Sequence, residues 1–411
     1  MKKQIYTGLL CGSLFFLTAC GGDGKSSDHK ESGNNGNEIK NPVVSVEDYA
    51  LNTEVLSPLS SLSKILTYKM QGIDGTETLA TSLLFVPKTT PPKNGWPIVV
   101  WAHGTTGVAD KCAPSKQGLT GNEYFIAKLL NAGYVVVAPD YEGLGSDGNH
   151  PFLNLKSEAY SITDAVVASK DYLTKQGKKV SSDWMAVGHS QGGHAALGAA
   201  QYADRAKLNY KGTIAIAPAS NLKAILIGGE DSVKDKPFNE QIPVLAGLDT
   251  FTSLIVAGMQ GHKTSVSYNE VFKNDLAKVA PLAESECYSD VGYALGGNMY
   301  DFALKNGNSI QNYGRTQDNF MSIKAIKEFL DVDSQPLTTK VSNPIIVYQG
   351  THDETVPRPA TDALIYQATQ LKMQINYKTD DEISEKWTHT TVYTNNLDTF
   401  VEDIKTLMPI Q

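Results

Sequence analysis

The chain of 411 residues has a shortage of positive charge and of cofactor motifs. Lys and Arg total 36 against 44 Asp and Glu, so the formal net charge is −8 at pH 7. Proteins that bind the phosphate backbone are normally basic, so a nucleic-acid partner is not expected. The sequence also has no P-loop, no H-E-x-x-H and no paired C-x-x-C motif. It therefore predicts no metal and no other cofactor.

The sequence also lacks an N-terminal apolar run long enough to span a membrane. Ile5–Ala19 has 15 residues, short of the roughly 20 that a spanning helix needs. The run follows two lysines and ends at Leu17-Thr18-Ala19-Cys20, which is typical of a bacterial lipoprotein signal peptide. We therefore expect residues 1–19 to be removed and Cys20 to be lipidated. An ordinary signal peptide cut nearby is the alternative.

The stretch 20–42 has no apolar spacing. It is rich in Gly, Ser, Asn and charged residues, so it is expected to be a flexible tether between the lipid and the fold. Gly21 rather than Asp follows Cys20, which favours the outer membrane in a cell that has two. The expected protein is exported, anchored to the bacterial cell envelope and monomeric.

Cysteine is scarce, with four residues in the chain. Cys11 leaves with the predicted signal peptide, and Cys20 is expected to carry lipid. Cys112 and Cys287 remain, and an even pair in an exported protein suggests one disulfide. Two separate buried thiols are the alternative.

What the sequence does contain, from about residue 63 onward, is an alternation of β-rich and amphipathic segments. Short apolar runs are typical of strands buried on both faces of a parallel sheet, and they occur at Ile98–Trp101, Tyr134–Ala138, Trp184–Val187, Ile214–Ala217 and Ile345–Tyr348. Helical spacing occurs at Asn122–Asn131, 157–176, Gln191–Arg205, Thr361–Lys372 and Leu397–Leu407. An antiparallel hairpin is expected first, from 63–71 and 76–86. The alternation predicts an α/β fold with a mostly parallel, doubly wound sheet.

The alternation stops between residues 221 and 343. This stretch has helical patches and no strong strand pattern. Structureless loops of such length are uncommon, so the segment is predicted to be an inserted, mainly helical cap. The core would then consist of two parts, 43–220 and 344–411.

The motif that points to chemistry is Gly188-His189-Ser190-Gln191-Gly192. It matches G-x-S-x-G and lies between a predicted strand and a predicted helix. A nucleophile at such a sharp turn needs small neighbours, and Gly188 and Gly192 supply them. Ser190 is therefore predicted to be a catalytic nucleophile.

A serine nucleophile needs a base and an orienting acid. In an α/β-hydrolase fold the chain order is Ser, acid, His. Asp353 follows the late strand Ile345–Tyr348, where the acid is expected; Glu354 and the pair Asp380 and Asp381 are the alternatives. His389 alone among the histidines has the right order and place for the base.

The other histidines are assigned lesser roles. His103 is expected to shape a turn, and His150 lies in a loop before Pro151. His189 and His194 flank the nucleophile, but neither is expected to approach it from the side of the base.

An oxyanion hole needs two N–H donors. One is predicted to be the backbone N–H of Gln191, directly after the nucleophile. The other is expected in the loop after Ile98–Trp101, with Thr105 as the first choice and Thr106 as the second. A plain glycine-rich turn is the alternative for this loop.

A second glycine motif could indicate a dinucleotide site. Residues 143–148 fit G-x-G-x-x-G, but a dinucleotide site needs the glycines to open a helix directly. His150-Pro151 intervenes here, so a loop near the rim of the pocket is expected instead.

Three segments together resemble the secretory lipase family of α/β-hydrolases, which includes lipase-A-like enzymes. They are 102–107 with 112–115 behind it, 139–145, and 188–193, and the resemblance spans about 80–220 and 344–392. The resemblance implies an α/β-hydrolase fold and hydrolysis of acyl esters by Ser190, Asp353 and His389. It also implies a helical cap over the pocket and a disulfide from Cys112 to Cys287.

The expected activity is that of a membrane-tethered serine ester hydrolase, a carboxylesterase or lipase, acting on short- or medium-chain esters or lipids. A serine peptidase or amidase of the same fold is the first alternative, because fold and triad do not separate these. A non-catalytic surface binding protein is the second. A broken triad would favour it, but every triad position here has a candidate.

Overall fold

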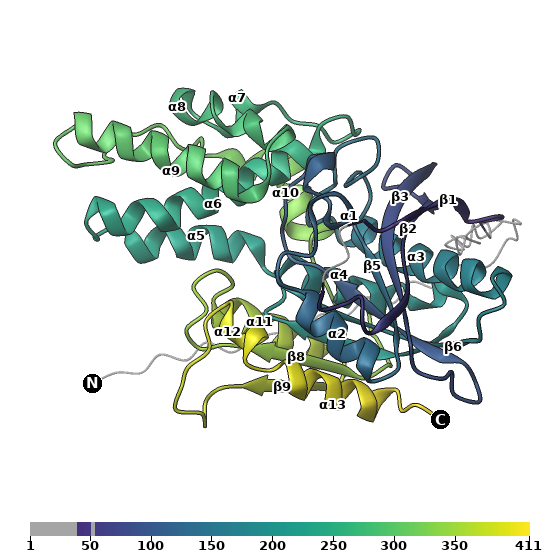
Figure 1. Cartoon of the computed structure of the whole chain (residues 1–411). Helices are drawn as coiled ribbons and strands as arrows, with labels where there is room; N and C mark the ends of the chain where they lie inside the picture. The colour runs from purple at the N-terminus through teal and green to yellow at the C-terminus, as the bar shows by residue number, and fades with distance from the viewer. Residues whose placement is uncertain (1–38, 51–53) are drawn as a thin grey trace, which may run out of the picture. The chain divides into compact units, whose positions relative to one another are not determined.

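The computed structural model describes residues 39–50 and 54–411, which form one unit from Ile39 to Gln411. The predicted signal peptide, the lipidation site Cys20 and most of the predicted tether lie outside these residues. The described chain contains a nine-stranded sheet (Figure 1), with strands β1 (Val43–Asp48), β2 (Ser60–Gln71), β3 (Glu77–Pro87), β4 (Trp96–Ala102), β5 (Val135–Pro139), β6 (Val180–His189), β7 (Asn209–Ile216), β8 (Ile345–Gln349) and β9 (Ile375–Thr379).

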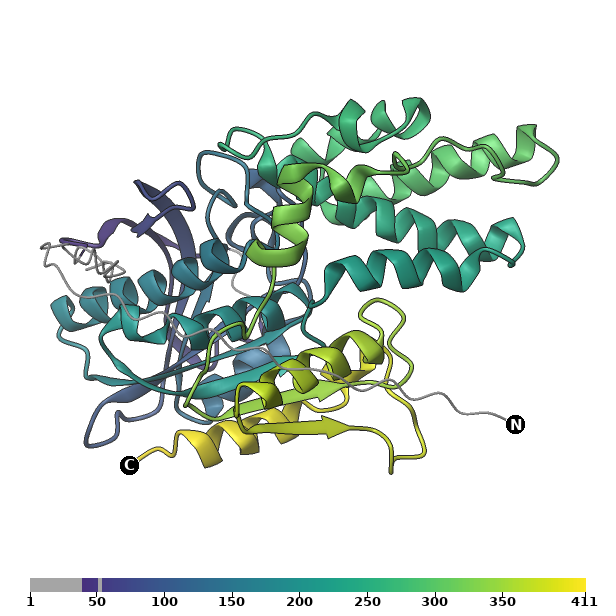
Figure 2. The ribbon, with the colours of Figure 1, turned by 180° about the vertical axis from the view of Figure 1, so that it is seen from behind.

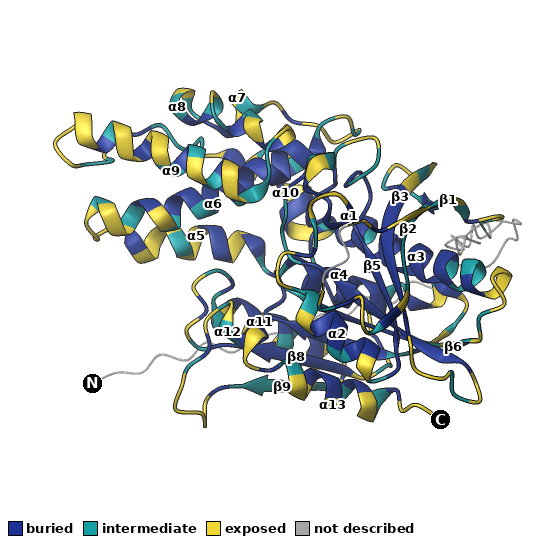
Figure 3. Ribbon diagram, viewed as in Figure 1, coloured by how far each residue is buried: buried dark blue, intermediate teal, exposed yellow. Residues whose placement is uncertain are grey.

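The strand order is β1-β2-β3-β5-β4-β6-β7-β8-β9. The pairs β1–β2, β2–β3 and β3–β5 are antiparallel, and every later pair is parallel. This mostly parallel sheet confirms the predicted α/β-hydrolase fold. In Figure 3 the central strands are dark blue, which marks them as buried.

Two groups of helices cover the two faces of the sheet. Neighbouring residues of β4 show the division, because Val100 packs in the cluster of α3 (Leu155–Lys175), α4 (Gln191–Gln201) and α11 (Arg358–Gln370). Val99 points the other way, into the cluster of α2 (Glu123–Asn131) and α13 (Leu397–Leu407). Both faces of the strand are therefore apolar, which explains the unbroken apolar run in the sequence.

Between β7 and β8 the chain forms helices and no strand. We call residues 222–333 the helical insertion; its α-helices are α5 (Leu222–Val233), α6 (Phe238–Met259), α7 (Tyr268–Val271), α8 (Asn274–Ala277), α9 (Tyr288–Lys305) and α10 (Lys324–Glu328). It has its own apolar cluster, in which Leu254, Val291 and Leu295 are fully buried. Figures 1 and 2 show its long helices α5, α6 and α9 running side by side from front and back.

Helix α6 is long and apolar enough to cross a membrane by length and composition, but 78% of its most apolar window is buried inside the protein. It contacts α5, α9 and the 3-10 turn Ala280–Glu284. Its apolar character is thus explained by its place at the centre of the helical insertion.

Candidate active site

Ser190 occupies a strained turn between a strand and a helix. Strand β6 ends at His189 and α4 begins at Gln191, so Ser190 is the residue between them. Its φ is +59°, a positive value that residues other than glycine rarely adopt. The Ser190 N–H donates to the carbonyl of Ile216 at 2.8 Å, which fixes the turn against β7. Such a turn presents the Ser190 side chain at the end of the sheet.

The two glycines around Ser190 are required by close backbone contacts. A Cβ at Gly192 would overlap the carbonyl of Ala102, and a Cβ at Gly188 would overlap the carbonyl of Gly192. The expectation that side chains would collide at both positions is confirmed.

We expect Gly192→Ala to lower the free energy of unfolding by about 3 kcal/mol, because the backbone of β4 must move to admit the methyl group. Gly297→Ala is the control, since nothing lies within 4 Å of a Cβ at this exposed position of α9. That change should stabilise the helix by roughly 0.5–1 kcal/mol. Urea denaturation measures both. Equal effects of the two substitutions would contradict the close packing at Gly192.

Asp353 and His389 lie together at the end of β8. The Nδ1–H of His389 donates to Oδ2 of Asp353 at 2.8 Å. The backbone N–H groups of Thr355 and Val356 donate to Oδ1 at 2.9 and 2.8 Å, and the Gln349 amide donates to Oδ2 at 3.2 Å. These four donors fix the Asp353 carboxylate. Because His389 uses Nδ1 for this hydrogen bond, its other ring nitrogen, Nε2, remains available as a proton acceptor.

None of the three alternative acids, Glu354, Asp380 and Asp381, has a hydrogen bond to His389 among the described residues. Glu354 is exposed, and Asp381 forms an ion pair with Arg358. Asp380 is fully buried and accepts the N–H groups of Thr351 and Trp387. Asp380 thus ties together the two loops that carry Asp353 and His389, but it does not contact His389.

His189 lies directly against His389. Its ring centroid lies 4.6 Å from that of His389, and its Nε2–H donates to the His389 carbonyl at 2.8 Å. On its other side it stacks on Tyr393, which stacks on Trp101. The sequence did not predict this contact of His189 with His389 and Tyr393. The strand before the nucleophile supports the loop that carries His389.

Buried histidines make the fold sensitive to acid. Burial lowers the pKa of His103 to about 4, and burial with the neighbouring His389 lowers the pKa of His189 to about 3. The unfolded chain takes up these protons below about pH 6.5, but the folded chain does not. Asp140 acts in the opposite sense, because burial raises its pKa to about 6 and it takes up a proton on folding.

We therefore expect the free energy of unfolding to fall between pH 6.5 and pH 5, by about 2 kcal/mol after the opposing effect of Asp140. Denaturant titrations at the two pH values measure this change. His103→Gln should reduce this fall in the free energy of unfolding, because the variant lacks one of the buried histidines that stay neutral in the folded chain. A stability that is constant or rising over this range would contradict the assignment.

A fully buried polar network holds the side chain of Gln191, the residue after Ser190. The side-chain amide of Gln191 donates to Oε1 of Glu158 at 2.8 Å and contacts Nε2 of His150 at 2.8 Å. Glu158 Oε2 lies 2.6 Å from Nδ1 of His194, whose Nε2–H donates to the Ser334 carbonyl at 3.0 Å. The network holds Gln191, whose backbone N–H follows the nucleophile.

Nothing in the sequence motifs singled out Glu158. It lies four residues before Ile162 and is therefore on the apolar face of the predicted helix 157–176, where a carboxylate needs a partner. That position is the signal that could have revealed it. His150, expected only in a loop, is fully buried.

A cavity of about 380 Å³ opens at Ser190. Its lining includes Ser190, His389, His189, Thr105 and Thr106. Both threonines predicted as oxyanion donors thus line the cavity at Ser190. No hydrogen bond joins Ser190 Oγ to His389 among the described residues, as is common for catalytic pairs without substrate.

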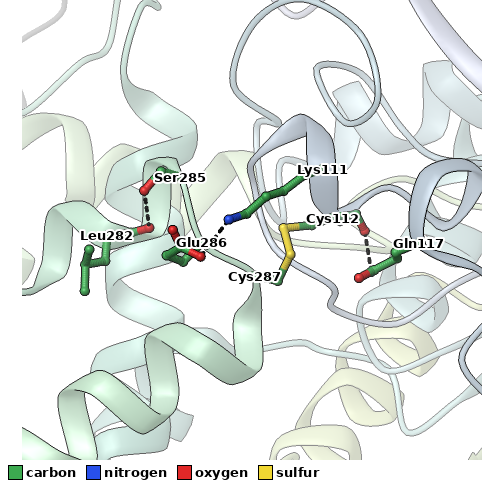
Figure 4. The surroundings of a disulfide bond; sticks show 7 residues. All are labelled: Lys111, Cys112, Gln117, Leu282, Ser285, Glu286 and Cys287. Carbon is green, nitrogen blue, oxygen red and sulfur yellow. Dashed lines mark hydrogen bonds and ion pairs between the residues drawn. A yellow bond between two sulfur atoms is a disulfide. The ribbon is translucent and has the colours of Figure 1, made fainter.

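The loop of Thr105 and Thr106 is tied to the helical insertion. A disulfide joins Cys112 to Cys287 (Figure 4), and Lys111 forms an ion pair with Glu286 beside it. The N–H of Tyr288, the residue after Cys287, donates to the Thr106 carbonyl at 2.9 Å. These contacts connect the start of α9 with the loop that borders Ser190.

The second glycine motif does not open a helix. Gly143, Gly145 and Gly148 have positive φ in a turn segment, and α3 begins only at Leu155. Leu144 packs under the disulfide rather than lining the cavity. Across residues 39–50 and 54–411, no group of three His, Cys, Asp or Glu is placed to hold a metal ion.

Comparisons with known proteins agree with this architecture. Crystal structures of similar fold include the rice cell wall degrading esterase LipA from Xanthomonas oryzae, with 19% identity, a TM-score of 0.65 and coverage of 89% of this chain and 97% of that chain. Lipase A from Candida antarctica has 17% identity and a TM-score of 0.67, with coverage of 91% and 83%. No curated protein sequence matches the chain significantly. The profile of the secretory lipase family, however, matches residues 117–397, which include Ser190, Asp353 and His389, and the chain therefore belongs to the secretory lipase family.

Proposed function

We propose that the protein is a serine ester hydrolase that forms an acyl-enzyme on Ser190. The observation that carries the proposal is the hydrogen bond of 2.8 Å between Asp353 and His389, with His389 and Ser190 lining one cavity. Membership of the secretory lipase family supports hydrolysis of an ester. The position of Ser190 at a strand-to-helix turn supports its role as the nucleophile.

In the proposed mechanism, Ser190 Oγ attacks the ester carbonyl while His389 Nε2 takes the serine proton. Asp353 holds the His389 tautomer and stabilises the imidazolium. The backbone N–H groups of Gln191 and Thr105 stabilise the oxyanion. His389 then protonates the leaving alcohol, and a water molecule activated by His389 releases the acid from Ser190.

The proposal extends to the organisation of the chain. The segment 221–343 serves as the cap, because Phe251 of α6 and Tyr288 of α9 line the cavity at Ser190. The family supports an exported protein. Lipid attachment at Cys20, an outer-membrane location and a monomeric state remain predictions from the sequence.

The proposal is tested with p-nitrophenyl esters from acetyl to palmitoyl and with the matching p-nitroanilides. A serine ester hydrolase should turn over at least one ester much faster than the corresponding anilide. Faster cleavage of the anilides would identify an amidase or peptidase instead. A folded protein with no turnover of either series would remove the enzyme hypothesis and favour a binding protein.

A further inference from the structure

We propose that the substrate is an ester of a short acyl group, of about two to four carbons, with a neutral alcohol that carries several hydroxyl groups. This inference rests on the proposed function and deepens it. It comes from two cavities of different size and chemistry that meet at Ser190.

The two cavities share one edge. The larger, which we call the polar cavity, has a volume of about 380 Å³, and the smaller, the apolar cavity, about 40 Å³. Both are bordered by the same four residues, Thr105, Ser190, Phe251 and Thr355. An ester carbonyl at Ser190 can therefore direct one substituent into each cavity.

The position of the base decides which substituent goes where. His389, His189 and Thr390 line the polar cavity and not the apolar one. Because His389 must protonate the oxygen of the leaving alcohol, the alcohol lies on its side, in the polar cavity. The acyl group then enters the apolar cavity, which Gln191 borders beside its predicted oxyanion N–H.

The walls of the apolar cavity suit an alkyl chain. Away from the shared edge and Gln191 they are entirely apolar. They come from the loop before α3, the loop after β7, helices α5 and α6, and the loop after β8: Phe152, Leu153, Ala219, Leu222, Ile225, Leu226, Ile255 and Val356. The helical insertion thus closes this cavity from one side.

The volume of the apolar cavity sets the chain length. By the same measure, a single water molecule needs roughly 10–15 Å³. A cavity of about 40 Å³ therefore admits about three or four atoms of similar size. An acetyl to butanoyl group therefore fits. A longer chain would have to displace α5 or α6, and such overpacking of an apolar core is unfavourable.

The polar cavity suits a different partner. Its lining is mixed and carries the hydroxyl or amide groups of Thr105, Thr106, Thr120, Asn122 and Thr390 beside the rings of Trp101, Tyr288 and Phe251 and the apolar side chains of Pro114, Leu119 and Ala138. The described lining has no Lys, Arg, Asp or Glu, so a neutral alcohol is favoured.

The acyl half is tested by kcat/KM of the full chain for p-nitrophenyl acetate, butanoate, hexanoate, octanoate and palmitate. We expect a maximum at acetate or butanoate and at least a tenfold fall at octanoate. A maximum at octanoate or longer would overturn the inference and leave the proposed ester hydrolysis intact. No turnover of any ester would instead overturn the proposed function.

Two variants separate cavity size from other causes of chain-length preference. Leu226→Ala and Ile255→Ala enlarge the apolar cavity, so each should raise the octanoate-to-acetate ratio of kcat/KM at least fivefold. Ile227→Ala is the matched control, because Ile227 is on the same helix α5, is 48% exposed and does not line this cavity. Its ratio should equal that of the wild type. Unchanged ratios in both enlarged variants would contradict the assignment of the acyl site.

The alcohol half is tested with a fixed acetyl group. Glycerol monoacetate and a monoacetylated methyl glucoside should be hydrolysed with higher kcat/KM than hexyl acetate. A clear preference for hexyl acetate would overturn the inference for the polar cavity.

Discussion

Replacing Ser190 with alanine should lower kcat/KM for p-nitrophenyl acetate by about 10⁴-fold or more, because the proposed nucleophile is lost. The substitution removes one hydroxyl group from a half-exposed turn, so it should leave the unfolding midpoint within a few degrees of the wild type. Activity and thermal unfolding of the two proteins measure the two effects separately.

The matched control for Ser190 is Ser220, which follows Ala219, whose N–H donates to the Ser190 carbonyl at 3.2 Å. Ser220 is fully buried a few residues after β7, and its Oγ has no partner among the described residues. Ser220→Ala should retain activity within about threefold. If Ser190→Ala kept most of its activity, the nucleophile would have to be a different group, and the proposed mechanism would fail.

Loss of the Cys112–Cys287 disulfide should lower the free energy of unfolding by about 5 kcal/mol, since the bridge closes a loop with a sequence separation of 175 residues. The bridge (Figure 4) also joins the start of α9 to the segment after β4, in which the Thr106 carbonyl accepts the N–H of Tyr288. Its loss should therefore lower kcat as well, because a displaced oxyanion donor typically costs ~10²-fold or more. Urea denaturation and ester turnover of the double variant Cys112→Ser, Cys287→Ser measure these effects.

The neighbouring ion pair supplies the control for this effect. Lys111 and Glu286 are linked across the same interface, but both side chains are partly exposed to solvent, so Lys111→Met should cost less than about 1 kcal/mol. A double cysteine variant as stable as Lys111→Met would show that the disulfide does not constrain the unfolded chain in the expected way.

Much of the fold was predictable because the central strands are buried on both faces. Such strands leave compact apolar runs, and β4 to β8 were all located from them. The edge strands β1 and β9 were not located, because their residues are mostly half-buried or exposed and alternate weakly. Helix α13 was located with its exact bounds, since its apolar residues Phe400, Val401 and Ile404 repeat at helical spacing.

The candidate site was predictable where residues follow directly from chain order. Ser190 follows β6, Asp353 follows β8 and His389 follows β9, so their order could be inferred from the sequence. The support of His389 by His189 could not be predicted, because it joins the end of β6 to a loop 200 residues further along the chain. The contribution of Phe251 and Tyr288 to the cavity was also hidden, since the packing of the helical insertion has no sequence motif.

The central claim is that an ester leaves its acyl group on Ser190, and trapping that intermediate tests it most directly. The protein would be mixed with p-nitrophenyl acetate, quenched in acid within milliseconds, digested and mapped by mass spectrometry. We predict one acetyl group on the peptide that contains Ser190, and none in Ser190→Ala. Steady turnover with the acetyl group on another residue, or with the same acetylation in Ser190→Ala, would contradict the account.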